Sequence, residues 1–190
     1  MDEVKVAILD SIGETKIDIN FSEMINNISK HKEIDCTLID LTRLNLLPCY
    51  GCEGCLKQTP GKCVMKDDTA QFMTPLAKSN IIIGITSVRY GGYSSDYKLV
   101  ADKFALMGSP YYGMKDGKLL HRKRYRDYVG YYVVGLGTSL SNEETENFRL
   151  LVKRNAMNMC VDHWGCIFTD GEDQRHLAQE VLGKVMNDER

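Results

Sequence analysis

Short apolar runs that alternate with amphipathic segments are the feature that most limits the fold of this chain. Each run has the length of a buried strand, and helix-like segments lie between them. Strands separated by helices form right-handed crossovers, so the alternation predicts a parallel sheet with helices on both faces. We therefore expect a three-layer α/β fold in one domain over residues 1–190. The predicted strands are 4–9, 34–40, 81–86, 131–135 and 164–169.

Capping residues mark the expected helix starts. Asn20 is a good N-cap residue, Ser94 or Ser95 precedes a third helical pattern, and Ser141 with Glu144 forms a capping-box pair. A helix that opens at 68–71 contains Pro75, which predicts a kink there or a restart after Thr74. Residues 109–128 have no clear periodicity and are predicted to be an excursion from the sheet.

Composition excludes several classes of protein. Hydrophobic residues make up 43% and charged residues 26%, and the formal net charge is −2, so nothing draws the chain to nucleic acid or to a membrane surface. Its apolar runs are too short to span a bilayer, and no signal peptide precedes the first strand. Seven cysteines, an odd number, favour a reducing cytoplasm over a disulfide framework.

Four of these cysteines lie in one short loop, Cys49, Cys52, Cys55 and Cys63, with the spacing C-x2-C-x2-C-x7-C. Thiolates at such spacing form a plausible ligand set for an iron–sulfur cluster, which takes soft sulfur ligands. Zinc also accepts four cysteines, although structural zinc sites usually pair two separated C-x2-C units. Free or redox-active thiols are the third alternative, because spacing alone does not select the metal.

The ends of three predicted strands form the expected ligand crevice. In doubly wound sheets, ligands bind outside the carboxyl ends of the strands, here the loops at 10–18, 87–94 and 135–141. Backbone N–H groups with Ser11, Thr15 and Lys16 suit a phosphate, and the glycine-rich turn after residue 86 suits a ring. No Ser/His/Asp set or phosphate-binding Walker motif is present.

Three blocks of sequence resemble one family. The first comprises 48–55 and 61–68, a compact cysteine run followed by an Asp-Asp pair at a helix start. The second is Val88-Arg-Tyr-Gly-Gly-Tyr-Ser94 with Lys98 and Asp102-Lys103 behind it, and the third is Gly135-Leu-Gly-Thr138. Together they resemble the flavodoxin-like NADPH-dependent FMN reductases, and specifically their iron–sulfur flavoprotein branch.

The resemblance implies a five-stranded parallel sheet in the order 2-1-3-4-5 with FMN at its C-terminal edge. It also implies an oxidoreductase that moves electrons between NAD(P)H, FMN and a [4Fe–4S] cluster or another acceptor, with no catalytic side chain. The first loop departs from the family, since Asp10 and Glu14 would face a phosphate. The alternative is a non-enzymatic thiol-switch or metal-sensing domain without flavin. The expected FMN contacts are Ser11, Thr15, Lys16, Ser87, Val88, Arg89, Tyr90, Gly91, Gly135 and Gly137.

Nine of the ten tyrosines lie between Tyr90 and Tyr132. We expect this cluster to serve a subunit interface or a flavin, with Tyr90 and Tyr93 near the ring. Together with the excursion at 109–128, it predicts a homodimer or higher homo-oligomer. The other expected partner is a small-molecule or protein electron donor or acceptor, while the basic run at 118–126 is interpreted as a solvated loop.

Overall fold

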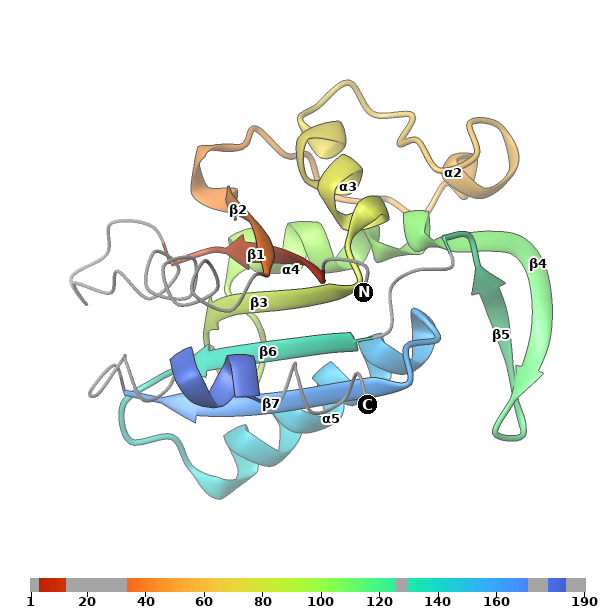
Figure 1. Ribbon diagram of the computed structural model, residues 1–190. Coiled ribbons are helices and arrows are strands. Elements are labelled where there is room, and N and C mark those ends of the chain that lie inside the picture. Colours follow the sequence, from red (N-terminus) through yellow and green to blue (C-terminus); the bar gives the residue numbers. More distant parts are fainter. Residues whose placement is uncertain (1–3, 13–33, 126–129, 171–177, 184–190) are drawn as a thin grey trace.

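The computed structural model describes residues 4–12, 34–125, 130–170 and 178–183. Its centre is a five-stranded, all-parallel sheet in the order β2-β1-β3-β6-β7 (Figure 1). Numbered among the parallel strands alone, this order is 2-1-3-4-5, so the predicted topology is confirmed. The strands are β1 (Lys5–Asp10), β2 (Asp35–Asp40), β3 (Ile81–Ser87), β6 (Gly130–Leu136) and β7 (His163–Thr169).

Hydrophobic burial accounts for the strand order. All seven residues of β6 and the first six of β3 are buried, as continuous apolar runs in the middle of a parallel sheet must be. At the edge of the sheet, β2 leaves most of its residues exposed or half-buried. Each face of the sheet carries one core cluster. The first contains buried side chains of α3, α4, η2 and α5, and the second contains those of helical residues 178–183.

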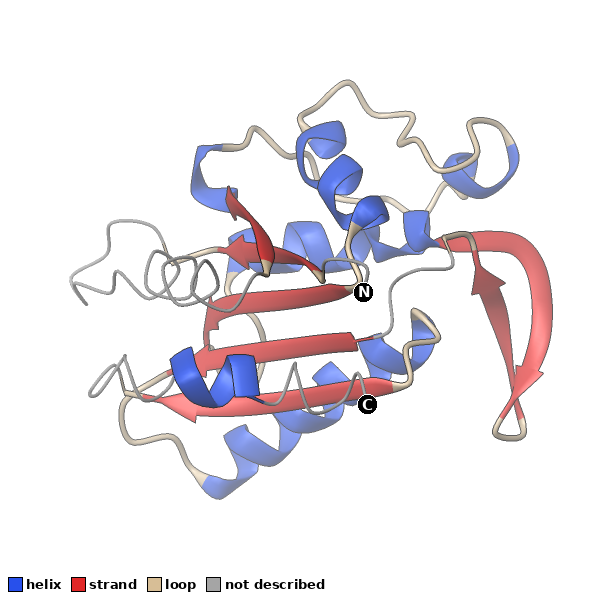
Figure 2. Ribbon diagram, viewed as in Figure 1, coloured by secondary structure: helices blue, strands red, loops and turns tan. Residues whose placement is uncertain are grey.

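Helices cover the sheet on both faces, as Figure 2 shows. Tyr97, Val100, Phe104 and Met107 are buried. The predicted capping box at Ser141 is also confirmed. The helix expected after Asn20 lies outside the described residues. The helical elements are η1 (Leu41–Arg43), α2 (Gly54–Lys57), α3 (Thr69–Lys78), α4 (Ser95–Ala101), η2 (Asp102–Met107) and α5 (Asn142–Asn158).

Of the two outcomes predicted at Pro75, a kink or a restart after Thr74, the restart does not occur. One helix runs from Thr69 to Lys78 with Pro75 inside it. Proline removes the hydrogen bond to the carbonyl four residues earlier, which belongs to the exposed residue Gln71, where water can replace the missing donor. The side chain of Ser79 then donates to the carbonyl of Pro75 at 2.9 Å and closes the last turn.

The excursion at 109–128 is more regular than predicted, because most of it is a β-hairpin. Strands β4 (Gly108–Lys115) and β5 (Lys118–Lys123) pair antiparallel and form a sheet of their own. Asp116 and Gly117 both have positive φ, at 50° and 73°, as a two-residue hairpin turn requires. The hairpin projects from the body of the protein beside α2 (Figure 1). Its strands lack a buried face, so they carry no clean alternation of apolar and polar residues.

Candidate functional site

A network of small hydroxyl groups ties the ends of β1 and β3 to the start of α4. The Ser11 hydroxyl donates to the Ile85 carbonyl at 2.9 Å and lies 3.0 Å from the Ser94 hydroxyl. Thr86 Oγ1 lies 2.9 Å from that hydroxyl and accepts from the Ser94 N–H at 3.1 Å. Ser94 in turn caps α4 by accepting from the Tyr97 N–H. These groups build a neutral, hydrogen-bonded floor at the predicted crevice.

A tight turn after β3 forms the next part of the crevice. Arg89 and Gly92 exchange both backbone hydrogen bonds, at 2.9 and 2.8 Å. Tyr90 and Gly91 at the turn have φ of 50° and 73°. A Cβ at Gly91 would lie 2.9 Å from Asn147 Cβ of α5, so glycine is needed both for its conformation and for its close approach. Tyr90 is 97% exposed at the tip, where it is free to meet a ligand or another molecule.

The ends of β3 and β6 meet at Val88 and Gly135. The Val88 N–H donates to the Leu136 carbonyl at 2.8 Å, and a Cβ at Gly135 would approach the Val88 side chain to 2.8 Å. Gly137 donates to the Thr169 carbonyl at 3.0 Å. The structure thus brings Ser87, Val88, Arg89, Tyr90 and Gly91 to the same sheet edge as Ser11, Gly135 and Gly137. Thr15 and Lys16 lie outside the described residues.

Tyr93 does not lie where the sequence placed it. It is only 8% exposed, and its hydroxyl lies 3.2 Å from that of Tyr131 and accepts from Asn155 Nδ2 at 3.0 Å. Burial raises the pKa of Tyr93 to about 12, although hydrogen bonds from its neighbours act in the opposite direction. Tyr97 and Tyr131 are also fully buried. Much of the tyrosine cluster therefore belongs to the core.

All four cysteines of the predicted metal site line one cavity of about 100 Å³. Cys49 and Cys52 are exposed, whereas Cys55 and Cys63 are half-buried. Burial raises the pKa of the Cys55 thiol, and the proximity of Cys49, Cys63 and Cys52 raises it further. The remaining walls are Tyr50, Gly51, Glu53, Leu56, Val64, Met65, Lys103, Ala105 and Leu106.

Among the described residues, no group of three or more His, Cys, Asp or Glu side chains is placed to hold one metal ion. A tetrahedral zinc site requires such an arrangement. A four-iron cluster does not, because each thiolate binds a different iron.

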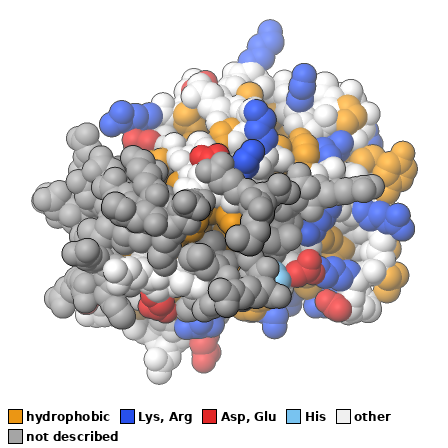
Figure 3. Space-filling model, in the orientation of Figure 1, with side chains coloured by type: hydrophobic (Ala, Val, Ile, Leu, Met, Phe, Trp, Pro, Cys, Tyr) orange, Lys and Arg blue, Asp and Glu red, His pale blue; other side chains and the backbone are white. Residues whose placement is uncertain are grey.

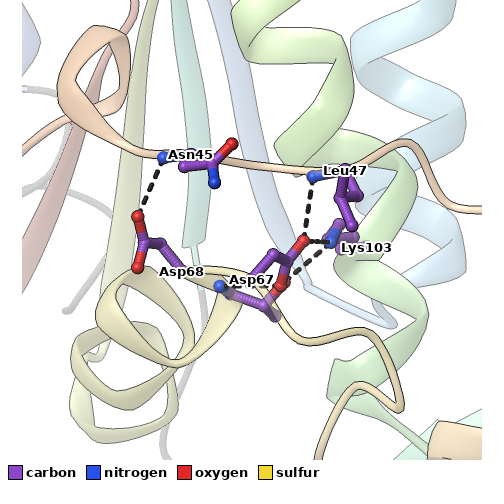
Figure 4. Close-up of polar contacts among 6 residues, drawn as sticks. Asn45, Leu47, Asp67, Asp68 and Lys103 are labelled. Atoms are coloured by element: carbon purple, nitrogen blue, oxygen red, sulfur yellow. Dashed lines mark hydrogen bonds and ion pairs between the residues drawn. The ribbon is translucent and has the colours of Figure 1, made fainter.

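A buried ion pair holds the cysteine loop in place, as Figure 4 shows. The side chains of Asp67 and Lys103 are 0% and 1% exposed and form a direct contact. Asp67 also accepts from the Leu47 N–H at 2.9 Å and from the hydroxyl of Thr69 at 2.6 Å. The pair thereby joins three segments: the chain entering the cysteine loop, the start of α3, and η2.

Asp68 adds a second attachment beside the first. Its carboxylate accepts from the Asn45 N–H at 2.8 Å, and its own N–H donates to the Asn45 carbonyl at 3.1 Å (Figure 4). Asp68 is the N-cap residue of α3 but makes no side-chain cap hydrogen bond, and the Asp67 carboxylate accepts from the Thr69 N–H at 3.1 Å instead. We call Asp67, Asp68 and Lys103 the staple of the cysteine loop.

Opposing effects determine the charge of the staple. Burial favours the neutral form of Asp67, but hydrogen bonds from Lys103, Thr69 and the Leu47 N–H outweigh burial and lower its pKa from 3.8 to about 2. The carboxylate is therefore ionised at neutral pH, opposite the Lys103 ammonium.

The cysteine cavity and the crevice lie at different ends of the sheet. Ser94 caps α4 in the crevice, and η2 ends at Met107, next to Leu106, which lines the cavity. The seven residues of α4 and the six of η2 together span roughly 20 Å at the usual helical rises. On the far side, Arg124 Nη2 donates to the Cys55 carbonyl at 3.4 Å, which fixes the loop to the base of the hairpin.

The sequence contained the staple without revealing its role. The Asp-Asp pair and Asp102-Lys103 belong to two separate blocks of the sequence. Asp67 and Lys103, which form the ion pair, are 36 residues apart in the chain. A charged lysine among apolar residues that face the core was the available signal, because such a side chain needs a buried partner.

Comparisons with known proteins agree with this architecture. No family model matches the chain. An NAD(P)H:quinone oxidoreductase from Methanothermobacter marburgensis has a similar structure, with a TM-score of 0.64 at 13% identity over 95% of both chains. An FMN-dependent NADH-azoreductase from Bacillus anthracis, solved with FMN, gives 0.64 at 10% identity over 97% of this chain and 98% of that one.

In sequence, the chain is 31% identical over 81 residues to an iron–sulfur flavoprotein from Methanocaldococcus jannaschii. The matched region spans 43% of this chain and about 40% of that protein. The chain therefore has the flavodoxin-like fold. The expected likeness to flavodoxin-like reductases is confirmed at the level of the fold, with structural neighbours among quinone and azo reductases.

Proposed function

We propose that this protein is an FMN-dependent oxidoreductase that takes electrons from NAD(P)H and passes them through a [4Fe–4S] cluster to an acceptor. The observation that carries the proposal is the single cavity that Cys49, Cys52, Cys55 and Cys63 line together. The reductase neighbours and the partial similarity to an iron–sulfur flavoprotein support it. No described helix has the length and apolar character needed to cross a membrane. We propose a cytoplasmic location because an odd number of cysteines favours a reducing compartment.

The residues of the crevice fit a flavin in the manner expected of this fold. The turn at 89–92 lies at the carboxyl ends of the parallel strands, where ligands of such sheets bind, and it presents the exposed ring of Tyr90. The bound flavin would supply hydride and one-electron chemistry. Ser11 donates both its hydroxyl proton and its backbone N–H to the Ile85 carbonyl, so its side chain can offer a ligand only an acceptor lone pair. The phosphate contacts then fall to the loop that contains Thr15 and Lys16.

The cysteine cavity fits a cluster in its chemistry. A cluster held there would exchange single electrons. Two half-buried thiols, Cys55 and Cys63, would form its inner side, and the exposed Cys49 and Cys52 its outer side. Leu56, Val64 and Leu106 give the cavity an apolar wall that limits access of water. The staple would hold the loop rigid during electron exchange.

We also propose that the protein works as a homodimer or larger homo-oligomer. Within one chain, roughly 20 Å of helix separates the crevice from the cysteine cavity, so a second copy could bring the two kinds of centre closer together. The hairpin exposes Tyr111, Tyr112, Met114 and Leu119, and apolar and basic side chains appear at that end of the molecule in Figure 3. Light scattering should give at least twice the 21.5 kDa chain mass, and a monomer at micromolar concentration would contradict this arrangement.

Anaerobic reconstitution with FMN, iron and sulfide tests the function. We expect quenching of FMN fluorescence on binding, uptake of iron, and bleaching of the flavin absorbance when NADPH or NADH is added. A protein that takes up iron but no FMN would instead act as a metal sensor. A protein that takes up neither iron nor FMN would be a thiol switch. Either result would overturn the proposed oxidoreductase function.

A further inference from the structure

A second and larger cavity, of about 450 Å³, lies at the base of the hairpin. It opens between β4 and β5, η2 and the C-terminal part of α5, so it is separate from the crevice. This volume is typical of small-molecule sites. Leu56 and Ala105 line both this cavity and the cysteine cavity, which makes the two neighbours.

An aromatic pair forms one wall of this hairpin cavity. The rings of Tyr112 and His121 lie 4.2 Å apart with a tilt of 33°. Tyr112 is 55% exposed, so the pair lies where the cavity meets solvent. Phe104 and Met159 contribute further apolar surface. Flat, apolar walls of this kind suit a planar ring.

The polar groups of the cavity include two hydrogen-bond acceptors, His121 Nε2 and Asn155 Oδ1, beside the amide of Asn158. His121 Nδ1 lies 2.8 Å from the Ser109 carbonyl, which can only accept, so Nδ1 carries the proton and Nε2 of the neutral ring is an acceptor. Asn155 uses its Nδ2 to donate to Tyr93, which leaves its Oδ1 for other partners. Asp102 contributes a carboxylate that is paired with Lys98. A ligand that bonds His121 Nε2 or Asn155 Oδ1 must carry a hydrogen-bond donor.

We propose that the hairpin cavity binds a planar, uncharged aromatic molecule with a hydroxyl group, that is, a compound of the phenol class. Its ring would lie against Tyr112, and its hydroxyl would donate to His121 Nε2 at the edge of the imidazole or to Asn155 Oδ1. The site does not depend on the function proposed above, because none of its walls is a cysteine or a residue of the crevice.

Titration of cluster-free, flavin-free protein with 2-naphthol, followed by its fluorescence, tests the ring contact. Tyr112→Ala should weaken binding about tenfold, because it removes a stacked aromatic wall. Tyr111→Ala is the matched control, since Tyr111 is the neighbouring exposed tyrosine and does not line the cavity. It should leave the affinity unchanged. No binding to the wild type, or equal losses in the two variants, would overturn the proposal.

Comparison of 2-naphthol with naphthalene tests the hydrogen bond. The wild type should prefer 2-naphthol by roughly fivefold, the effect of one net hydrogen bond. His121→Phe keeps a ring beside Tyr112 but removes Nε2, so this preference should disappear. If the variant retains the full preference and Asn155→Leu does too, neither proposed acceptor binds the hydroxyl and the assignment to phenols is wrong.

Discussion

The two candidate centres of this protein are held by different kinds of interaction. At the crevice, neutral hydroxyl groups of Ser11, Thr86 and Ser94 bond one another and the strand ends. At the cysteine loop, a fully buried charge pair, Asp67 and Lys103, connects three segments that no sheet holds together. The crevice inherits its geometry from the sheet, whereas the cysteine loop needs a dedicated attachment. Loss of the Asp67–Lys103 pair should therefore disturb the cysteine loop far more than the crevice.

The largest expected effect comes from Lys103→Met. It leaves the Asp67 carboxylate buried without its counter-charge, and removal of one partner of a buried pair costs about 3–5 kcal/mol. Urea unfolding at pH 7 should show this loss.

The control for this variant is Lys98→Met, which breaks a similar Lys–Asp pair with Asp102. That pair is exposed, with side chains 53% and 42% accessible, and should contribute less than about 1 kcal/mol. Equal losses from Lys103→Met and Lys98→Met would show that the staple does not stabilise the loop.

The next largest effect is a dependence of the unfolding free energy on pH. Because the folded pKa of Asp67, about 2, lies below its ordinary value of 3.8, its stabilisation is present above pH 3.8 and is lost as pH falls through 2. This shift corresponds to about 2 kcal/mol. The difference in unfolding free energy between the wild type and Asp67→Asn should shrink by about that amount from pH 5 to pH 2. Parallel pH profiles would contradict the assignment.

A smaller effect is expected at the crevice. Ser94→Ala removes the cap of α4 and a partner of Ser11 and Thr86, which should cost about 1–2 kcal/mol. Ser95→Ala is the control, because Ser95 is exposed and provides no cap. Thermal unfolding compares the two. A loss for Ser94→Ala no greater than for Ser95→Ala would mean that the hydroxyl network is not a structural floor.

Much of the fold was predictable because burial leaves a clear pattern in sequence. Continuous apolar runs gave β3 and β6, and the pair Ser141 and Glu144 gave the start of α5. The hairpin was not predictable from periodicity, since neither of its strands packs on the main core. Pro75 does not end α3, because a single missing hydrogen bond near the surface costs less than breaking a helix that is packed through Phe72 and Leu76.

The sequence suggested residues for the candidate sites, which stay predictions, but it did not reveal the contacts that hold the cysteine loop. The spacing of the cysteines was enough to place them around one cavity. Tyr93 was misplaced because its neighbour in sequence, Tyr90, is at the surface, while the chain turns inward at the start of α4. The bond between Asp67 and Lys103 depends on tertiary contact, which local pattern does not report.

The most direct test of the account is iron content and electron paramagnetic resonance, measured with FMN content in the same anaerobically reconstituted samples. We predict about four irons per chain in the wild type and a cluster signal on reduction. Cys52→Ala should lose that signal and keep FMN, whereas Cys36→Ala, which changes a cysteine in β2 away from the cavity, should keep both. No iron in the wild type, or a full signal in Cys52→Ala, would contradict a cluster held by the cysteine loop.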